Sequence, residues 1–243
     1  MALHFIDETA GSIAVGDTLT LTGAEAHHAA AVRRVRVGEA VTVTDGRGAW
    51  LEGECEAVAP REVVVRITGR RDESEPRPRL ALAQALAKGD RDELAVQAAT
   101  ELGVDEIVPW QASRSVSRWE GPKAEKGRQR WATIVREAAK QAHRAWLPEV
   151  AAIATTAALA ARAAGERVLV LEPTAEVRLS SLDLTDDSTI VLVVGPEGGI
   201  APDELARLEA AGATRVRLGD TVLRTSTAGP AALALVNARL GRW

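Results

Sequence analysis

Cysteine, tyrosine, phenylalanine and methionine are almost missing from this chain of 243 residues, which contains one Cys, no Tyr, one Phe and one Met. The single cysteine, Cys55, has no second cysteine to pair with, so an intramolecular disulfide is excluded and no cysteine-based metal site is expected. Cys55 lies between Glu54 and Glu56, an alternation that predicts a buried position on a strand. The six tryptophans are the main aromatic side chains.

Long apolar runs and an early basic segment are missing as well. The longest nearly apolar stretch, 151–161, is too short and too often interrupted by threonine to span a bilayer. The first eight residues contain acids and no basic cluster, which argues against a secretory signal. Hydrophobic (46%) and charged (26%) contents are ordinary for a globular protein. We therefore expect a cytoplasmic protein with neither a membrane nor a metal among its partners.

Positive charge is in deficit over the whole chain but not in two of its segments. The net charge is −4, which argues against generic nucleic-acid binding. Residues 112–146, however, contain nine basic side chains against three acidic ones, and Arg33, Arg34 and Arg36 form a smaller cluster. Segregated positive charge attracts phosphates whatever the net charge is. The charge alone is equally compatible with a solvated helix face.

The pattern of expected strands and helices changes along the chain, which predicts two domains separated by a linker. Residues 1–72 read as mostly β with one helical patch at 24–34, which favours a small barrel over a βαβ unit. The segment 70–79 is polar, charged and twice interrupted by proline, as linkers are. The remainder, 78–243, forms the second domain. Strands of the first domain are expected at 18–22, 40–44, 50–58 and 62–68.

In the second domain strands and helices alternate, which predicts an α/β fold. The run Ile190–Val194 is continuously apolar, as in strands of a parallel sheet that are buried on both faces. Trp131 recurs with other apolar residues at helical spacing and is expected in the core. Strands are expected at 80–86, 106–110, 167–171, 189–194 and 215–218, and helices at 90–102, 123–143, 202–211 and 227–240.

The glycine-rich run Gly195-Pro-Glu-Gly-Gly199 follows a buried strand and leads into a helix with Pro202 near its start. Such a loop at the carboxyl end of a parallel strand is where open α/β sheets bind ligands, because glycine lets the backbone approach closely. The run is neither a dinucleotide fingerprint nor a P-loop, since it lacks the glycine and lysine spacings of those motifs. Taken alone, it is more simply a strand-to-helix turn.

A second loop, 218–229, also follows a strand and leads into a helix. It contains Arg224, several hydroxyl groups and helix-capping residues at 225–227. An arginine just before a helix N-terminus indicates an anionic or electron-rich group nearby. A third strand end, 171–174, is similar but weaker. We expect these three loops to meet at one edge of the sheet and build one pocket.

Together these motifs resemble the RsmE family, which methylates N3 of a uridine in 16S ribosomal RNA of the small subunit. The resemblance rests on Gly195-Pro-Glu-Gly-Gly199 and on the block Val222-Leu-Arg-Thr-x-Thr-Ala228 that follows it. It extends to Lys88-Gly-Asp-Arg-Asp-Glu93, to Glu101-Leu-Gly-Val104, to the helix Glu137…Gln141…Arg144 and to the N-terminal stretch 27–46, and so covers nearly the whole chain.

The resemblance implies an S-adenosylmethionine-dependent RNA methyltransferase of the SPOUT superfamily. It implies a C-terminal SPOUT domain with a trefoil knot at about 168–243, a PUA-like RNA-binding barrel and a homodimer built from the knotted domains. Where the family often has glutamate, this chain has Ser226, so that glutamate cannot be the base, and Ser226 is expected to cap the following helix. The cofactor-binding residues that the family implies are Leu171, Gly195, Glu197, Gly198, Leu218, Gly219, Leu223, Thr225 and Thr227.

Methyl transfer to uridine N3 requires loss of a weakly acidic proton, and the resulting anion delocalises onto O2 and O4. A cation near these oxygens stabilises that anion, and Arg224 is our candidate. The alternative is a structural arginine that pairs with a helix end or an acid. Glu137 is a lesser candidate for the proton acceptor, with Gln141 and Arg144 along the same helix face. The alternative for Glu137 is a surface ion pair with Lys140 or Arg144.

RNA contacts are expected from basic and polar side chains in both parts of the chain. His27 and His28 have no further His or Cys nearby in sequence, so a helix surface or an RNA contact is favoured over a metal site. Trp50 is expected in the core, with stacking on a base as the alternative. The predicted RNA-binding residues are Arg33, Arg34, Arg36, Arg114, Gln141 and Arg144.

Two rival functions remain open. One is another SPOUT RNA methyltransferase with a different acceptor atom, and the other is a non-catalytic factor that binds ribosomal RNA during assembly. The intact glycine-rich run and the block Leu223-Arg-Thr225 argue against a degenerate methyltransferase. Measured cofactor binding distinguishes the enzyme from the assembly factor.

Overall fold

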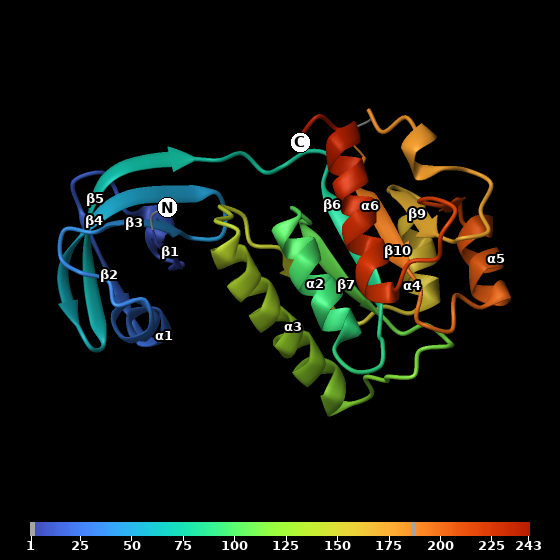
Figure 1. Cartoon of the computed structure of the whole chain (residues 1–243), viewed down its shortest axis with the longest axis horizontal. Coiled ribbons are helices and arrows are strands. Elements are labelled where there is room, and N and C mark those ends of the chain that lie inside the picture. Colours follow the sequence, from blue (N-terminus) through green and yellow to red (C-terminus); the bar gives the residue numbers. More distant parts are fainter. Residues whose placement is uncertain (1–2, 186–187) are drawn as a thin grey trace. The chain divides into compact units, whose positions relative to one another are not determined.

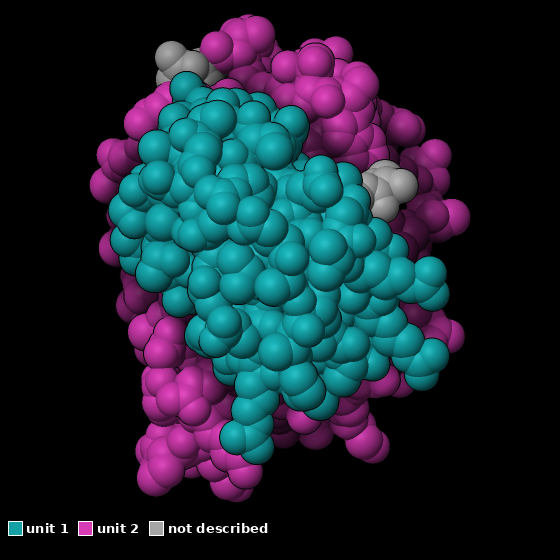
Figure 2. Space-filling model, turned by 90° about the vertical axis from the view of Figure 1, so that its left-hand side faces the viewer, with its two compact units in different colours: residues 1–75, 139–147 teal, residues 76–138, 148–243 magenta. Residues whose placement is uncertain are grey.

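The computed structural model describes residues 3–185 and 188–243 (Figure 1). These residues form two compact units, coloured separately in Figure 2. Unit 1 comprises the described residues up to Glu75 together with Ala139–Leu147, and unit 2 comprises those of Pro76–Ala138 and Pro148–Trp243. The sequence predicted domains at 1–72 and 78–243, and these bounds stay a prediction. The packing of 139–147 with unit 1 was not predicted.

Unit 1 contains a five-stranded sheet in the order β1-β3-β4-β5-β2. β1 pairs with β3 in parallel, and all other neighbours are antiparallel. The four strands expected from alternation are confirmed, whereas β1 was missed. The strands are β1 (Leu3–Ile6), β2 (Thr18–Thr22), β3 (Ala40–Thr44), β4 (Ala49–Ala59) and β5 (Glu62–Asp72).

The helical patch expected at 24–34 forms as two short pieces. The first is α1 (Gly23–His27), and a π-helical turn, η2 (His28–Val32), follows it directly. A further 3-10 turn, η1 (Ala10–Ser12), joins β1 to β2. Ala26 and Ala29 of these turns are fully buried.

The core of unit 1 consists of the inward-facing residues of its strands, among them Phe5, Leu21, Leu51 and Val65. Cys55 is 1% exposed in the same core, which confirms the prediction of a buried strand residue. Burial raises the pKa of the Cys55 thiol, so this cysteine is held in its unreactive protonated form.

The linker predicted from residue 70 begins later than expected. β5 continues to Asp72, and the Arg70 guanidinium donates to both carboxylate oxygens of Asp72, at 3.1 and 2.8 Å. Because residues i and i+2 of a strand lie on the same face, opposite charges at this spacing form a pair without leaving the strand. The charge pattern that resembled a linker is therefore, over its first three residues, the exposed face of a strand.

Unit 2 is built on a six-stranded sheet in the order β11-β9-β10-β6-β7-β8, with all neighbours parallel. Every residue of the central strands β6 and β10 is buried, which confirms the predicted parallel α/β domain. The strands are β6 (Leu80–Ala85), β7 (Glu106–Trp110), β8 (Glu149–Val150), β9 (Arg167–Leu171), β10 (Ile190–Val194) and β11 (Thr214–Val216).

Helices cover both faces of this sheet and give it two cores. Leu82 contributes to the core that also contains Trp131 and Leu233, whereas Ala83 contributes to the core that contains Leu159 and Leu208. Alternate residues of a strand point to opposite faces, so α2, α3 and α6 pack on one side and α4 and α5 on the other. The helices are α2 (Arg91–Glu101), α3 (Pro122–Gln141), α4 (Thr156–Arg162), α5 (Pro202–Ala210) and α6 (Thr225–Arg239), with a 3-10 turn η3 (Leu179–Ser181).

Most predicted elements of unit 2 are confirmed to within two residues at each end, but α4 and β8 were missed. α4 overlaps the alanine-rich stretch 151–161 and ends one residue beyond it, and its amphipathic pattern is weak because alanine fits either face. The Thr155 hydroxyl accepts a hydrogen bond from the Ala158 amide and caps the helix. Within the described part of the chain, no helix is long and apolar enough to cross a bilayer.

Candidate functional site

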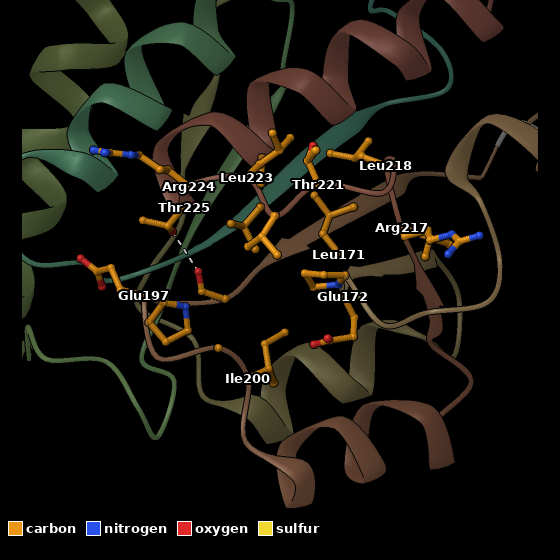
Figure 3. Close-up of a pocket in the computed structure, with 18 of the residues that line it drawn as sticks. Leu171, Glu172, Glu197, Ile200, Arg217, Leu218, Thr221, Leu223, Arg224 and Thr225 are labelled. Carbon is orange, nitrogen blue, oxygen red and sulfur yellow. Dashed lines mark hydrogen bonds between the residues drawn. The ribbon is translucent and has the colours of Figure 1, made fainter.

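The carboxyl ends of β9, β10 and β11 open into one pocket of unit 2, with a volume of about 430 Å³ (Figure 3). This volume is in the range of small-molecule sites. The prediction that the three loops build one pocket is confirmed. The predicted residues that line it are Leu171, Gly195, Glu197, Leu218, Gly219, Leu223, Arg224 and Thr225.

The walls of the pocket combine apolar side chains with a few charged ones. Ile200 and Val216 add to the leucines already predicted, while Glu172 and Arg217 place opposite charges in the lining. Glu172 Oε1 accepts hydrogen bonds from the amide and the hydroxyl of Thr174, at 3.3 and 3.0 Å, which fixes this carboxylate. Such walls suit a ligand that has an apolar body and groups of both charges.

Two of the predicted cofactor residues do not line the pocket. The carbonyl of Gly198 accepts a hydrogen bond from Arg114 Nη1 at 3.0 Å, and a Cβ atom at Gly198 would lie 3.5 Å from Arg114. Thr227 is exposed on α6. Arg114, predicted to bind RNA, therefore holds the glycine-rich loop, and the predicted contacts of Gly198 and Thr227 with a cofactor have no support from the lining.

The glycines of the pocket differ in whether the backbone or the packing requires glycine at their position. A Cβ atom at Gly195 would lie 2.6 Å from Ile200 Cγ1, so a side chain there is sterically excluded. Gly199 has φ +71°, a left-handed conformation that favours glycine. A Cβ atom at Gly219 would meet nothing within 4 Å, and its φ lies outside the left-handed region. A side chain at Gly219 would thus extend into open space at the pocket wall.

Thr225 ties the pocket loops together. Its hydroxyl donates to the carbonyl of Gly195 and accepts from Gln84 Nε2, both at 2.9 Å, and the side chain is buried. These bonds join the start of α6 to the ends of β10 and β6. The prediction that Ser226 caps the helix is wrong, because α6 begins at Thr225 and places Ser226 inside its first turn. The residue at the cap position is Arg224, and its side chain forms no cap hydrogen bond.

Glu197 joins the glycine-rich loop to the start of α2. Its Oε1 atom accepts hydrogen bonds from the Lys88 amide at 3.0 Å and from Arg91 Nη1 at 2.9 Å. Burial raises the pKa of Glu197, but hydrogen bonds from its own amide, Lys88 and Arg91 outweigh burial, so the pKa lies below its ordinary value. Arg91 also lines the pocket and was missed, although it lies within the segment Lys88–Glu93 that the family resemblance had marked.

Arg224 is exposed, and in Figure 3 its side chain extends away from Leu171 and Leu218. Among residues 3–185 and 188–243, no hydrogen bond or ion pair involves its guanidinium. The alternative of a structural arginine that pairs with an acid or a helix end therefore has no support among the described residues. Arg217 differs, because it forms an ion pair with Asp220 at 3.9 Å.

The helix face predicted to combine Glu137, Gln141 and Arg144 is interrupted. α3 ends at Gln141, and His143 has φ +53°, so Arg144 does not continue the face and that prediction is wrong. Glu137 does not line the pocket, and its role as a proton acceptor stays a prediction.

The predicted RNA-binding arginines of unit 1 follow η2 and are exposed: Arg33, Arg34 and Arg36 flank the buried Val35. His28 packs edge-on against Phe5 at 6.3 Å, which gives this ring a structural role, whereas His27 is exposed. Trp50 and Trp131 are buried, at 6% and 1% exposed, as expected for core residues.

Comparison with known proteins connects this architecture to a family. Residues 73–237 match the model of an RNA methyltransferase domain, and residues 21–68 match the model of an RNA methyltransferase PUA domain. The chain is similar to the ribosomal RNA small subunit methyltransferase E of Mycobacterium bovis, with 44% identity over 96% of this chain and 89% of the relative. It is similar to that of Bacillus subtilis, with 31% identity over 98% and 96%.

Solved structures are similar to this chain over nearly its full length, as the sequence relatives are. The ribosomal RNA small subunit methyltransferase E of Neisseria gonorrhoeae, bound to S-adenosylmethionine, superposes with a TM-score of 0.88 at 28% identity and covers 98% of both chains. A Legionella pneumophila protein in complex with the same cofactor gives the same TM-score, identity and coverage.

Proposed function

The chain belongs to the ribosomal RNA small subunit methyltransferase E (RsmE) family, and from that premise we propose that it transfers a methyl group from S-adenosylmethionine to N3 of a uridine in 16S ribosomal RNA. The observation that carries this proposal is the pocket at the ends of β9, β10 and β11, because it combines apolar walls, opposite charges and an open glycine. The small ribosomal subunit as substrate implies a cytoplasmic location.

The pocket fits the proposed cofactor. Leu171, Ile200 and Leu218 offer apolar surface to an adenine ring, and Gly219 leaves room for close approach of a ligand to the backbone. Glu172 and Arg217 complement the ammonium and carboxylate of a methionine moiety. When bound, S-adenosylmethionine supplies a methyl group already activated on a sulfonium. The protein therefore needs only to bind, orient and tune charge.

Arg224 is the residue proposed to act on the acceptor. It lines the pocket and is exposed, and within the described residues its guanidinium has no hydrogen-bond or ion-pair partner, so its donors are available to a ligand. Placed beside O2 or O4 of uracil, it stabilises the anion that forms as N3 loses its proton. Glu137 remains the candidate proton acceptor, although it lies on α3 and away from the pocket lining.

The acceptor uridine must present N3, which base pairing hides, so an unpaired or flipped-out nucleotide is required. Arg33, Arg34 and Arg36 are the exposed cations of unit 1 that would bind the surrounding phosphates. Gln141 and Arg144 belong to the same unit and add polar and positive groups. We propose that unit 1 holds the RNA through these side chains.

A homodimer is proposed through α6 and the loop before it. From Thr225 to Ala238 the helix carries no charged side chain, and Val222 in the preceding loop is 79% exposed. Apolar surface of this kind is usually covered by a partner, and a second copy of the chain is the proposed one. Light scattering at micromolar concentration should give the mass of a dimer, and the mass of a monomer would contradict the proposal.

The finer fold assignments, a closed PUA-like barrel in unit 1 and a trefoil knot at about 168–243, are also proposed from the family. The strand order of unit 2 supports the knot, because the chain leaves the sheet at its edge strand β11 and returns through α6 to pack on β10 and β6 (Figure 1). The backbone path in a crystal structure tests both assignments.

The function is tested with the full chain and small ribosomal subunits from a strain that lacks the modification. Titration calorimetry should show S-adenosylmethionine binding, and incubation of the three components should produce 3-methyluridine. A methyl group on ribose or on another base would favour the rival SPOUT methyltransferase. Absence of cofactor binding, with RNA binding retained, would favour the non-catalytic assembly factor.

A further inference from the structure

Unit 1 contains a cluster of aromatic rings that the RNA-binding predictions did not include. His4 stacks on Trp50 with ring centroids 4.6 Å apart and on His143 at 5.0 Å, with interplanar angles of 19° and 22°. The Arg71 guanidinium lies over the Trp50 ring at 4.3 Å. His4 and Trp50 are buried, whereas His143 is half-buried, so the ring that reaches solvent is His143.

The backbone at His143 is unfavourable for histidine. The residue has φ +53°, and it follows α3 in a Schellman motif, in which the His143 amide donates to Lys140 O and the Arg144 amide to Ala139 O. Glycine is the most common residue at this left-handed position because it has no Cβ atom, although Asn, Asp and His occur there more often than other side chains. The end of α3 therefore does not require histidine at position 143, because glycine adopts this backbone conformation more readily.

The surroundings of His143 are positively charged. Burial lowers the pKa of His143, and nearby positive charges that include that of Arg33 lower it further. Arg34 and Arg36 follow Arg33 in the same exposed segment, and Arg144 is the next residue along the chain. A ring that stays neutral at physiological pH, beside several arginines, presents a π face next to phosphate-binding groups.

We propose that His143 stacks on one unpaired base of the RNA substrate, while Arg33 and its neighbours bind the adjacent phosphates. Stacking on an aromatic ring is how proteins hold single-stranded bases without reading their sequence. Trp50 and His4 support the His143 ring from inside the unit and keep it in place. The inference rests on the proposed function, because it specifies where unit 1 contacts the RNA.

The test uses the full-length protein and a fluorescent single-stranded RNA oligonucleotide that contains uridine, with affinity measured by anisotropy at pH 7.5 over a range of salt concentrations. His143→Gly removes the ring and relieves the left-handed strain, so the variant should fold with a thermal midpoint within about 5 °C of the wild type. His143→Asn, which tolerates the same backbone conformation, is the second variant. Arg34→Gly, at the other left-handed non-glycine residue of unit 1, is the matched control.

We expect His143→Gly and His143→Asn to bind the oligonucleotide about 5- to 50-fold more weakly, with an unchanged salt dependence, because a neutral ring contributes stacking and no ion pair. Arg34→Gly should reduce the slope of log affinity against log salt by about 0.7. Equal affinity of the His143 variants, or a reduced salt slope for them, would overturn the inference while leaving the methyltransferase function intact. Failure of the wild type to bind RNA would overturn both.

Discussion

Gly219 offers the cleanest perturbation of the proposed cofactor site. It lines the pocket, a Cβ atom there would meet no protein atom within 4 Å, and its φ needs no glycine. Gly219→Val should therefore leave the fold intact and place a branched side chain where the ligand binds. Gly195 and Gly198 are poorer choices, because a side chain at Gly195 would clash with Ile200 and one at Gly198 would contact Arg114.

The expected magnitude follows from overpacking. A ligand that meets three additional heavy atoms must shift or lose contacts, and inserting comparable volume into a packed site costs about 1–3 kcal/mol. At about 1.4 kcal/mol for each tenfold change, S-adenosylmethionine should bind about 5- to 150-fold more weakly. Gly219→Ala, which adds one atom, should give a smaller loss. The free energy of unfolding of the ligand-free protein should change by less than about 0.5 kcal/mol, because a Cβ atom at Gly219 meets no protein atom within 4 Å.

Calorimetric titration of S-adenosylmethionine into each variant measures this loss, and urea unfolding confirms that the fold is kept. Gly165→Val is the matched control, because Gly165 is exposed after α4, also has open space at its Cβ position and lies outside the pocket. The control should bind like the wild type. Equal affinity of Gly219→Val and Gly165→Val would refute the assignment of this pocket to the cofactor.

Four further predictions concern single side chains. Arg224→Ala should lower the rate of methyl transfer to the RNA and spare S-adenosylmethionine affinity, and Arg224→Lys should recover little, because a point charge does not replace a planar fork. Thr225→Val should lower the free energy of unfolding by about 2–4 kcal/mol in urea, because two buried partners lose their hydrogen bonds, whereas Thr225→Ser should restore it. Glu25→Gln should cost about 3 kcal/mol, because it removes a negative charge 3.1 Å from the Lys140 ammonium, whose side chain is 3% exposed. Burial, and then the charge of His143, lowers the pKa of His4 from 6.5 to about 4. As the pH falls, His4 therefore gains its proton in the unfolded chain before it does so in the folded chain. Between pH 6.5 and 4 the free energy of unfolding should fall by up to about 3 kcal/mol more in the wild type than in His4→Phe.

Alternation and apolar runs predicted most of the fold. The bounds of β2, β3 and β9 agree with the sequence-based ranges, because β-branched residues on half-buried or buried strands leave a clear pattern. β1 and β8 were missed because four and two residues are too few to show a period. The packing of 139–147 with unit 1 was missed for another reason: it depends on long-range contacts such as the Lys140–Glu25 ion pair at 3.1 Å.

The sequence predicted those pocket residues that lie in loops of unusual composition. It did not predict the residues that reach the pocket only because separate strands end side by side. The glycine-rich run and the block around Arg224 identified two walls. Glu172 lies in the strand end 171–174, which the sequence marked only weakly as a third wall. Arg217 gave no signal, since single charges near strand ends are common. The parallel arrangement of β9 and β11 brings both residues to one cavity. The cap of α6 was predicted at Ser226 but lies two positions earlier, at Arg224. Thr225 is the first residue of the helix, and its hydroxyl donates to the carbonyl of Gly195.

The central claim, methylation of uridine N3 in 16S ribosomal RNA, is tested most directly in cells. Mass spectrometry of the nucleosides of 16S ribosomal RNA should show that deletion of the gene removes 3-methyluridine. Expression of the wild-type chain should restore it, while Arg224→Ala should restore little. If 3-methyluridine persists in the deletion strain, or if another methylated nucleoside disappears in its place, the proposed acceptor is wrong.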